Sequence, residues 1–123
     1  MRVLMIFLAI GLLAGCGSDN TKTDAPVAIS DGAALYAANC ASCHGGELQG
    51  TARGPAHLSI VYEPSHHSDE SFRRAIANGV PAHHWNFGDM PPVEGLSSAQ
   101  VDAIIGYVRE VQQREGFEPY PPQ

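Results

Sequence analysis

The sequence predicts a small all-α domain of three to four helices, and three features of the chain lead to this fold class. Its 123 residues suffice for one small domain. Signals for the start of a helix occur near residues 30, 68 and 97. The stretch from Cys40 to His44 reads Cys-Ala-Ser-Cys-His, the Cys-x-x-Cys-His pattern that marks attachment of a c-type haem. The helices are therefore expected to surround one covalently bound haem.

The two cysteines and the histidine of this motif each have a chemical role. Cys40 and Cys43 lie three positions apart, so one turn of backbone brings both thiols to the same side, where they can form thioethers with the vinyl groups of one haem. His44 follows directly, and its imidazole can then reach the iron. A zinc site would need a second cysteine pair and a dithiol redox motif would need a βαβ context; the sequence offers neither.

The composition favours a core completed by a cofactor and excludes one class of partner. Aromatic residues make up 7% of the chain, and 13 glycines and 9 prolines leave little with which to bury a large apolar core unaided. A covalently held haem would supply the missing core. The formal net charge of −6 argues against binding nucleic acid. It favours redox protein partners with basic docking surfaces.

Residues 1–15 have the features of a signal peptide. Arg2 gives a positive start, and the apolar run from Val3 to Leu13 is too short to span a bilayer. The Leu-Ala-Gly-Cys sequence that ends at Cys16 resembles the lipobox of bacterial lipoproteins, which implies that Cys16 is lipidated and becomes the new N-terminus. An ordinary signal peptide is the alternative, but it leaves the third cysteine of an exported protein without a role. The predicted location is lipid-anchored, on the outer side of the cytoplasmic membrane or facing the periplasm.

The rest of the chain divides into three parts. Residues 16–29 lack a helical period and are rich in polar residues, which predicts a flexible tether between the lipid and the domain. The folded domain is expected over residues 30–116. Residues 117–123 are predicted to form an extended, proline-rich tail.

The first helix is expected to run to about Asn39, capped by Ser30 or Asp31. Its alanines favour a helix. Gly32 and Tyr36 lie four positions apart and therefore share one face.

The middle helix is expected to begin after Ser68, which can cap it, and to end at Asn78-Gly79. Asp69 and Glu70 suit its first turn. Three apolar side chains share the face expected toward the haem: Phe72, Ala75 and Ile76. Two basic side chains are expected to face water: Arg73 and Arg74.

The last helix has the strongest local signals. Ser97 and Gln100 form a capping box, and Leu96 with Val101 forms a hydrophobic staple. An apolar stripe follows: Val101, Ile104, Ile105, Val108 and Val111. Gly106 is expected to allow a close approach to a neighbour. The polar positions are expected to form a solvated face: Asp102, Arg109, Glu110 and Arg114.

From about residue 30 to residue 113 the chain resembles the class I cytochromes c. In that family, the helix leading into the haem motif crosses the C-terminal helix and carries a glycine and an aromatic residue. Gly32 and Tyr36 fit these positions, and Ile104 and Tyr107 are similar to the facing pair on the last helix. The resemblance implies a small cytochrome c fold around one haem.

The resemblance also implies the groups around the iron. A proline after the motif offers its carbonyl to the far nitrogen of the proximal histidine, and Pro55 fits this role. A methionine in a Met-Pro loop before the last helix is the distal ligand, and Met90 stands there. Met90 packed in a core gap is the alternative, and His83 and His84 are competing ligands.

Other polar residues of the middle region are assigned from their position in the chain. Arg53 is a candidate to pair with a haem propionate. Trp85 is a candidate to pack at the haem edge and donate its indole N–H to a propionate, and an interface or core role is the alternative. Three histidines are expected as surface or loop groups: His57, His66 and His67. Two adjacent imidazoles are a weak metal signal without further ligands.

Two axial ligands would shield the iron and suit outer-sphere transfer of one electron. The sequence therefore predicts a monohaem electron carrier between redox partners in the cell envelope, and not an enzyme. The alternative is a haem electron-transfer subunit of a larger membrane-associated dehydrogenase or oxidase complex. A peroxidase or gas sensor would need an open iron site, and no distal acid–base pair is evident.

Overall fold

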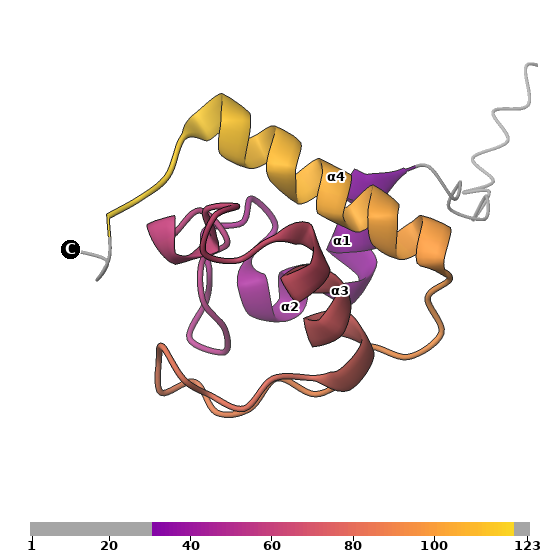
Figure 1. The fold of residues 1–123 in the computed structure, drawn as a ribbon, viewed down its shortest axis with the longest axis horizontal. Helices are drawn as coiled ribbons and strands as arrows, with labels where there is room; N and C mark the ends of the chain where they lie inside the picture. Colours follow the sequence, from indigo (N-terminus) through magenta and orange to yellow (C-terminus); the bar gives the residue numbers. More distant parts are fainter. Residues whose placement is uncertain (1–30, 120–123) are drawn as a thin grey trace, which may run out of the picture.

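The computed structural model describes residues 31–119 (Figure 1). Cys16, the predicted signal peptide and the predicted tether lie outside the described residues. Within the described range the elements are α1 (Gly32–Asn39), α2 (Ala41–His44), η1 (Ile60–Tyr62), α3 (Asp69–Asn78) and α4 (Ser98–Glu115). These residues contain isolated β-bridges and no strand, so the predicted all-α fold is confirmed. No helix of this range has the length and apolar character needed to cross a membrane.

Each of the three expected helices begins at a cap that the sequence predicts. At the start of α1, Asp31 Oδ1 accepts a hydrogen bond from the backbone N–H of Ala34 at 3.0 Å. Ser68 caps α3 in the same way. Ser97 caps α4, and Gln100 completes the predicted capping box. These caps satisfy N–H groups that have no partner inside the helix, so short local patterns determine where the helices begin.

α4 crosses α1, and a glycine at the crossing lets the two helices approach closely (Figure 1). A Cβ atom on Gly32 would lie 2.9 Å from the Cβ of Tyr107, nearer than side chains ordinarily pack. The rings of Tyr36 and Tyr107 lie 5.5 Å apart. The predicted crossing is therefore confirmed. The close approach predicted at Gly106 is wrong, because Gly106 is exposed and a Cβ there would meet nothing within 4 Å.

The core lies beneath this crossing and reaches α3. It combines buried residues of three helices and of the loop after α2: Leu35, Tyr36, Leu48, Phe72, Ile104, Ile105, Val108 and Val111. Leu96 and Val101, the predicted staple pair, both pack against it. The predicted apolar stripe of α4 is confirmed, since its residues supply half of this cluster.

Arg109 joins α4 to α3 and to the turn before α3. Its side chain is only 13% exposed, and its Nε lies 2.8 Å from Asp69 Oδ1. Its Nη1 and Nη2 donate to the backbone carbonyls of Tyr62 and His67 at 2.6 and 2.5 Å. The prediction that Arg109 lies on a solvated face is therefore wrong, and its guanidinium is a structural link between distant parts of the chain.

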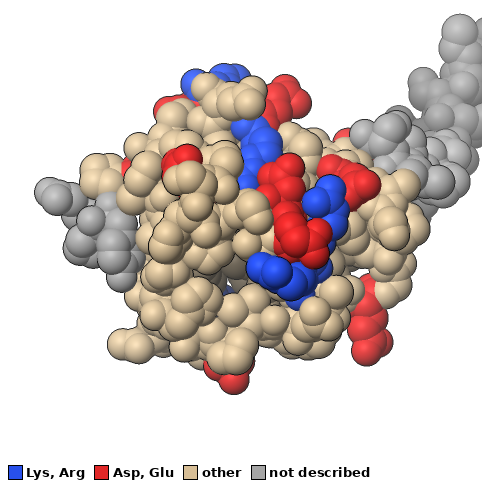
Figure 2. Space-filling view, viewed as in Figure 1, with Lys and Arg blue, Asp and Glu red and all other residues tan. Residues whose placement is uncertain are grey.

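Charged side chains of both signs gather over α3 and α4 on the face that Figure 2 shows. Arg73 is exposed there, as predicted, and pairs with Asp102 at 2.9 Å. Arg114 pairs with its neighbour Glu115 at 2.8 Å. Because the two signs alternate, this face is not uniformly acidic despite the net charge of −6.

Met90 lies where the loop after α3 closes on itself. Gly79 ends α3 with a φ of +73°, and a Cβ there would run into the carbonyl oxygen of Met90. Val80 and Met90 exchange backbone hydrogen bonds of 2.9 Å in both directions. Beyond the loop, the Val93 N–H donates to the carbonyl of Ile76 at 2.8 Å. Met90 is thus held half-buried at a fixed place beside α3.

The described part of the predicted tail lies against the domain. The Ile60 N–H donates to the carbonyl of Glu118 at 2.8 Å, and the Glu118 N–H donates to the carbonyl of Leu58 at 2.7 Å. These bonds join the residues after α4 to the segment that contains η1.

Candidate haem site

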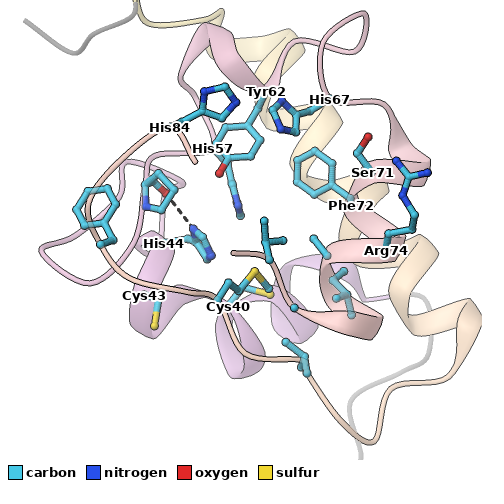
Figure 3. Close-up of a pocket in the computed structure, with 18 of the residues that line it drawn as sticks. Cys40, Cys43, His44, His57, Tyr62, His67, Ser71, Phe72, Arg74 and His84 are labelled. Carbon is cyan, nitrogen blue, oxygen red and sulfur yellow. Dashed lines mark hydrogen bonds between the residues drawn. The ribbon is translucent and has the colours of Figure 1, made fainter. Parts of the chain in front are cut away.

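A cavity of about 550 Å³ lies between α2, α3 and the loop after α3 (Figure 3). All of the predicted haem-site residues border it: Cys40, Cys43, His44, Pro55 and Met90. Apolar side chains of α3 and α4 form further parts of its wall: Phe72, Ala75, Ile76, Ile104 and Val108. The apolar face of α3 therefore points to the cavity, as predicted.

His44 is held in one orientation at the end of α2. Its Nδ1–H donates to the carbonyl oxygen of Pro55 at 2.9 Å, which is the contact that the family resemblance implies (Figure 3). Gly54 lets the Pro55 segment lie close to the motif, since a Cβ there would be 3.0 Å from the carbonyl oxygen of Cys43. Burial lowers the pKa of His44, which keeps the ring neutral. Its Nε2 therefore retains a lone pair, the form of imidazole that binds metals.

The two motif cysteines are free thiols on the cavity wall. Burial, together with the nearby Cys43, raises the pKa of Cys40 to about 11. The Thr51 hydroxyl donates to the backbone carbonyl of Cys43 at 2.7 Å, so the loop after the motif is bound to it by more than one contact. Both cysteines are half-buried and border the cavity.

His57 is a site residue that the sequence analysis missed. Its ring stacks on that of His44 with centroids 4.0 Å apart, and its exposed fraction is 8%. Its Nδ1 shares a hydrogen bond with the Tyr36 hydroxyl at 3.3 Å, and its carbonyl accepts from Gln112 Nε2 at 2.6 Å. The expectation of a surface group is wrong, because partners 21 and 55 positions away in the chain enclose it.

The far wall of the cavity holds Met90 together with its competitors. His83 and His84 border the cavity as well. The three candidates for the sixth iron ligand are therefore the same in the structure as in the sequence. Trp85 borders the cavity too, and its ring stacks on Tyr62 with centroids 6.0 Å apart. This position is compatible with its predicted place at the haem edge.

The basic group at the cavity differs from the one predicted. Arg53 is exposed and is not among the residues that border the cavity. Arg74 of α3 is exposed, as expected, and its side chain also borders the cavity (Figure 3). A long arginine side chain can reach the rim of a cavity while its charged end stays in water.

The residues present fit a covalently attached haem. Two unpaired thiols, a neutral imidazole oriented by a carbonyl and a thioether face one largely apolar space. Soft sulfur and imidazole nitrogen are the donors that haem iron takes in electron-transfer proteins.

The fold and the cavity together define a small all-α protein built to hold a covalent haem. The family model of cytochrome c matches residues 29–112. The chain belongs to the cytochrome c family, which implies covalently bound haem c with its iron and a role in electron transfer.

Two known proteins illustrate the relationship. The chain is 33% identical over 113 residues to cytochrome c-551 of Bacillus subtilis (strain 168), covering 85% of this chain and 89% of that protein. Its fold is similar to that of the c-type cytochrome XoxG from Methylobacterium extorquens AM1, with a TM-score of 0.55 and 21% identity. That alignment covers 77% of this chain and 56% of the XoxG chain, and it supports the fold alone.

Proposed function

We propose that this protein is a monohaem electron carrier of the cell envelope, with the haem attached at Cys40 and Cys43 and the iron bound by His44 and Met90. The observation that carries the proposal is the shared cavity wall, on which the two thiols, the Pro55-oriented imidazole and the thioether all lie. When bound, the haem supplies an iron that cycles between Fe(II) and Fe(III).

The protein's own residues prepare both axial positions. The Pro55 carbonyl fixes the tautomer and the orientation of His44 and raises its basicity. The Val80–Met90 hydrogen bonds and the proline that follows Met90 restrict the methionine loop, which helps a weak thioether to remain on iron. Apolar side chains exclude water from the rest of the cavity, and burial of this kind influences the reduction potential.

An electron carrier and an enzyme differ in access to the iron. With His44 and Met90 both holding the iron, small substrates would not reach the metal, and electrons would pass through the exposed edge of the haem. The reduced protein should therefore bind carbon monoxide slowly and show one reversible one-electron wave in a potentiometric titration. Rapid binding of carbon monoxide would favour a gas sensor or peroxidase, and constant copurification with a catalytic subunit would favour the larger complex.

We also propose export and a lipid anchor at Cys16, supported by the signal-peptide features of residues 1–15. The tether that follows would let the domain reach soluble and membrane-bound partners. In a membrane fractionation, the Cys16→Ser variant should move to the soluble fraction after export, and the wild-type mature N-terminus should carry the mass of lipid. A Cys16→Ser variant that remains membrane-bound would remove the anchor from the proposal.

Redox partners are proposed to carry basic docking surfaces, since the chain has 13 acidic against 7 basic residues. Among the described residues, the cavity borders carry no aspartate or glutamate. The attraction would therefore come from the overall charge and steer the encounter, and charges more than about 8 Å apart would be largely screened at physiological ionic strength. Electron-transfer rates should fall as salt rises; rates independent of salt would exclude this steering.

A further inference from the structure

Histidines from two separate segments meet at one part of the cavity border. His66 and His67 lie in the turn before α3, whereas His83 and His84 lie in the loop after it. His67 and His84 lie at the same end of the pocket as Tyr62 in Figure 3. The proposed haem ligands do not use this group, and neither adjacent pair suffices for a metal site in the sequence alone.

The side chains of His66, His67 and His84 each offer one ring nitrogen, and these three atoms lie within 4.8 Å of one another. The ring centroid of His84 lies 5.4 Å from the centroid of His66 and 5.4 Å from that of His67. A tetrahedral zinc ion, with Zn–N distances of about 2.0–2.1 Å, needs its ligand atoms about 3.4 Å apart. The three ligand atoms must therefore draw closer together to hold the ion, and the exposed His66 has room to move.

We propose that His66, His67 and His84 form a binding site for a divalent transition-metal ion of the kind that prefers imidazole, such as Zn²⁺. Three histidines leave the fourth tetrahedral position open to water, as in zinc sites with three protein ligands. The exposed His66 gives the ion a path from solvent.

The His67 half of the site is already oriented for a metal. Its Nδ1–H donates to the carbonyl of Val61 at 2.6 Å, so Nε2 keeps the lone pair. Metal-binding histidines usually donate their second N–H to such a carbonyl. The backbone is fixed as well: the N–H groups of His66 and His67 donate to the carbonyl of Glu63 at 2.9 and 2.8 Å, and Arg109 donates to the His67 carbonyl at 2.5 Å.

The His84 half belongs to a loop whose ends are closed. Val80 and Met90 pair at 2.9 Å, and the Ala82 N–H donates to Asp89 Oδ1 at 2.9 Å. Burial, together with the neighbouring histidines, lowers the pKa of His84, and burial lowers the pKa of His67. Neutral imidazole is the form that coordinates metal, so these two shifts favour metal binding at His67 and His84.

His83 provides a matched control. It is exposed, adjacent to His84 in the chain, and its Nδ1–H donates to the carbonyl of Pro81 at 2.9 Å. It is not one of the three residues whose ligand atoms converge. Its replacement changes the same loop and the same number of histidines without removing a proposed ligand.

The test is a calorimetric titration of the chelator-treated holoprotein with Zn²⁺, followed by zinc K-edge X-ray absorption of the complex. We expect one Zn²⁺ per protein and three nitrogen ligands at about 2.0–2.1 Å. His66→Gln and His84→Gln should each weaken binding by at least about tenfold, while His83→Gln should leave it unchanged. Unchanged haem absorption in each variant would show that the domain is folded and that none of these residues is an axial ligand.

Three results would overturn the site. The first is a holoprotein that binds no stoichiometric Zn²⁺. The second is a zinc absorption spectrum that shows fewer than three nitrogen ligands. This measurement uses the wild-type protein, so it tests the site even if a variant fails to fold. The third is an equal loss of affinity in His83→Gln, or full affinity in His66→Gln and His84→Gln.

Discussion

Replacing Gly32 with alanine should destabilise the protein, although alanine is the better helix former. Helix propensity alone favours alanine by about 1 kcal/mol. The added Cβ would meet the backbone carbonyl of Ala103 and would lie 2.9 Å from both its carbonyl carbon and the Cβ of Tyr107, where ordinary contacts begin at 3.4 Å. None of these atoms is the end of a flexible side chain, so α1 and α4 must separate.

Overpacking of this kind costs about 1–3 kcal/mol, with the upper part of that range expected where backbone atoms are involved. After the gain in propensity is subtracted, the free energy of unfolding should fall by about 1–2 kcal/mol. The melting temperature should then fall by about 4–8 °C for each kcal/mol in a domain of this size. Guanidinium unfolding of the holoprotein, followed by far-ultraviolet circular dichroism, measures the change.

Gly106→Ala is the matched control, because it makes the same substitution in the interior of α4, where a Cβ meets nothing within 4 Å. It should raise stability by up to about 1 kcal/mol through propensity alone. Opposite signs for the two variants are the expected result. A Gly32→Ala variant as stable as the wild type, or two variants with the same effect, would refute the role given to the helix crossing.

Three further substitutions test other contacts. Arg109→Leu should lower the free energy of unfolding by about 2 kcal/mol, since it leaves two part-buried carbonyls without a charged donor. Arg114→Leu at the surface should leave the guanidinium midpoint unchanged, and equal effects of the two substitutions would contradict a structural role for Arg109. Ser97→Ala should cost about 1 kcal/mol and speed hydrogen exchange in the first turn of α4, and unchanged exchange would contradict the cap. Gly79→Ala should weaken the ferric sulfur-to-iron absorption band, because the added Cβ would displace Met90. Gly88→Ala should keep the band, since Gly88 has a similar positive φ of +87° but open space around it. Loss of the band in both variants would indicate general strain in the loop and not displacement of Met90.

The helix boundaries and the haem motif could be predicted because their causes are local. Ser68 and Ser97 cap helices through N–H groups only three residues away. Cys40, Cys43 and His44 act as one contiguous motif, so their shared position on the cavity follows from one turn of helix.

The features that sequence reasoning missed depend on distant contacts. His57 is enclosed by Tyr36 and Gln112, 21 and 55 positions away, and nothing beside it in the chain indicates burial. Arg109 reaches Asp69 and the Tyr62 carbonyl across 40 and 47 positions. The sequence pattern of α4 does not distinguish Arg109 from an arginine that faces water, because the segment it binds has no regular pattern of its own.

The prediction of a close contact at Gly106 was wrong because no contact forms there. A glycine in a helix costs stability, so a close contact was expected there, as at Gly32. Only the crossing geometry distinguishes the two positions, since Gly32 faces α4 and Gly106 faces solvent. The convergence of His66, His67 and His84 likewise brings together two segments that are separated by α3 in the chain.

The most direct test of the proposed electron carrier is the ferric absorption spectrum and midpoint potential of Met90→Ala beside those of the wild type, with His84→Gln as the control. Because methionine ligation raises the potential of a haem iron, the Met90→Ala variant should lose the sulfur-to-iron band and show a lower potential. His84→Gln should retain the band. A Met90→Ala variant that keeps both the band and the potential, or a His84→Gln variant with an altered axial spectrum, would contradict His44 and Met90 as the iron ligands.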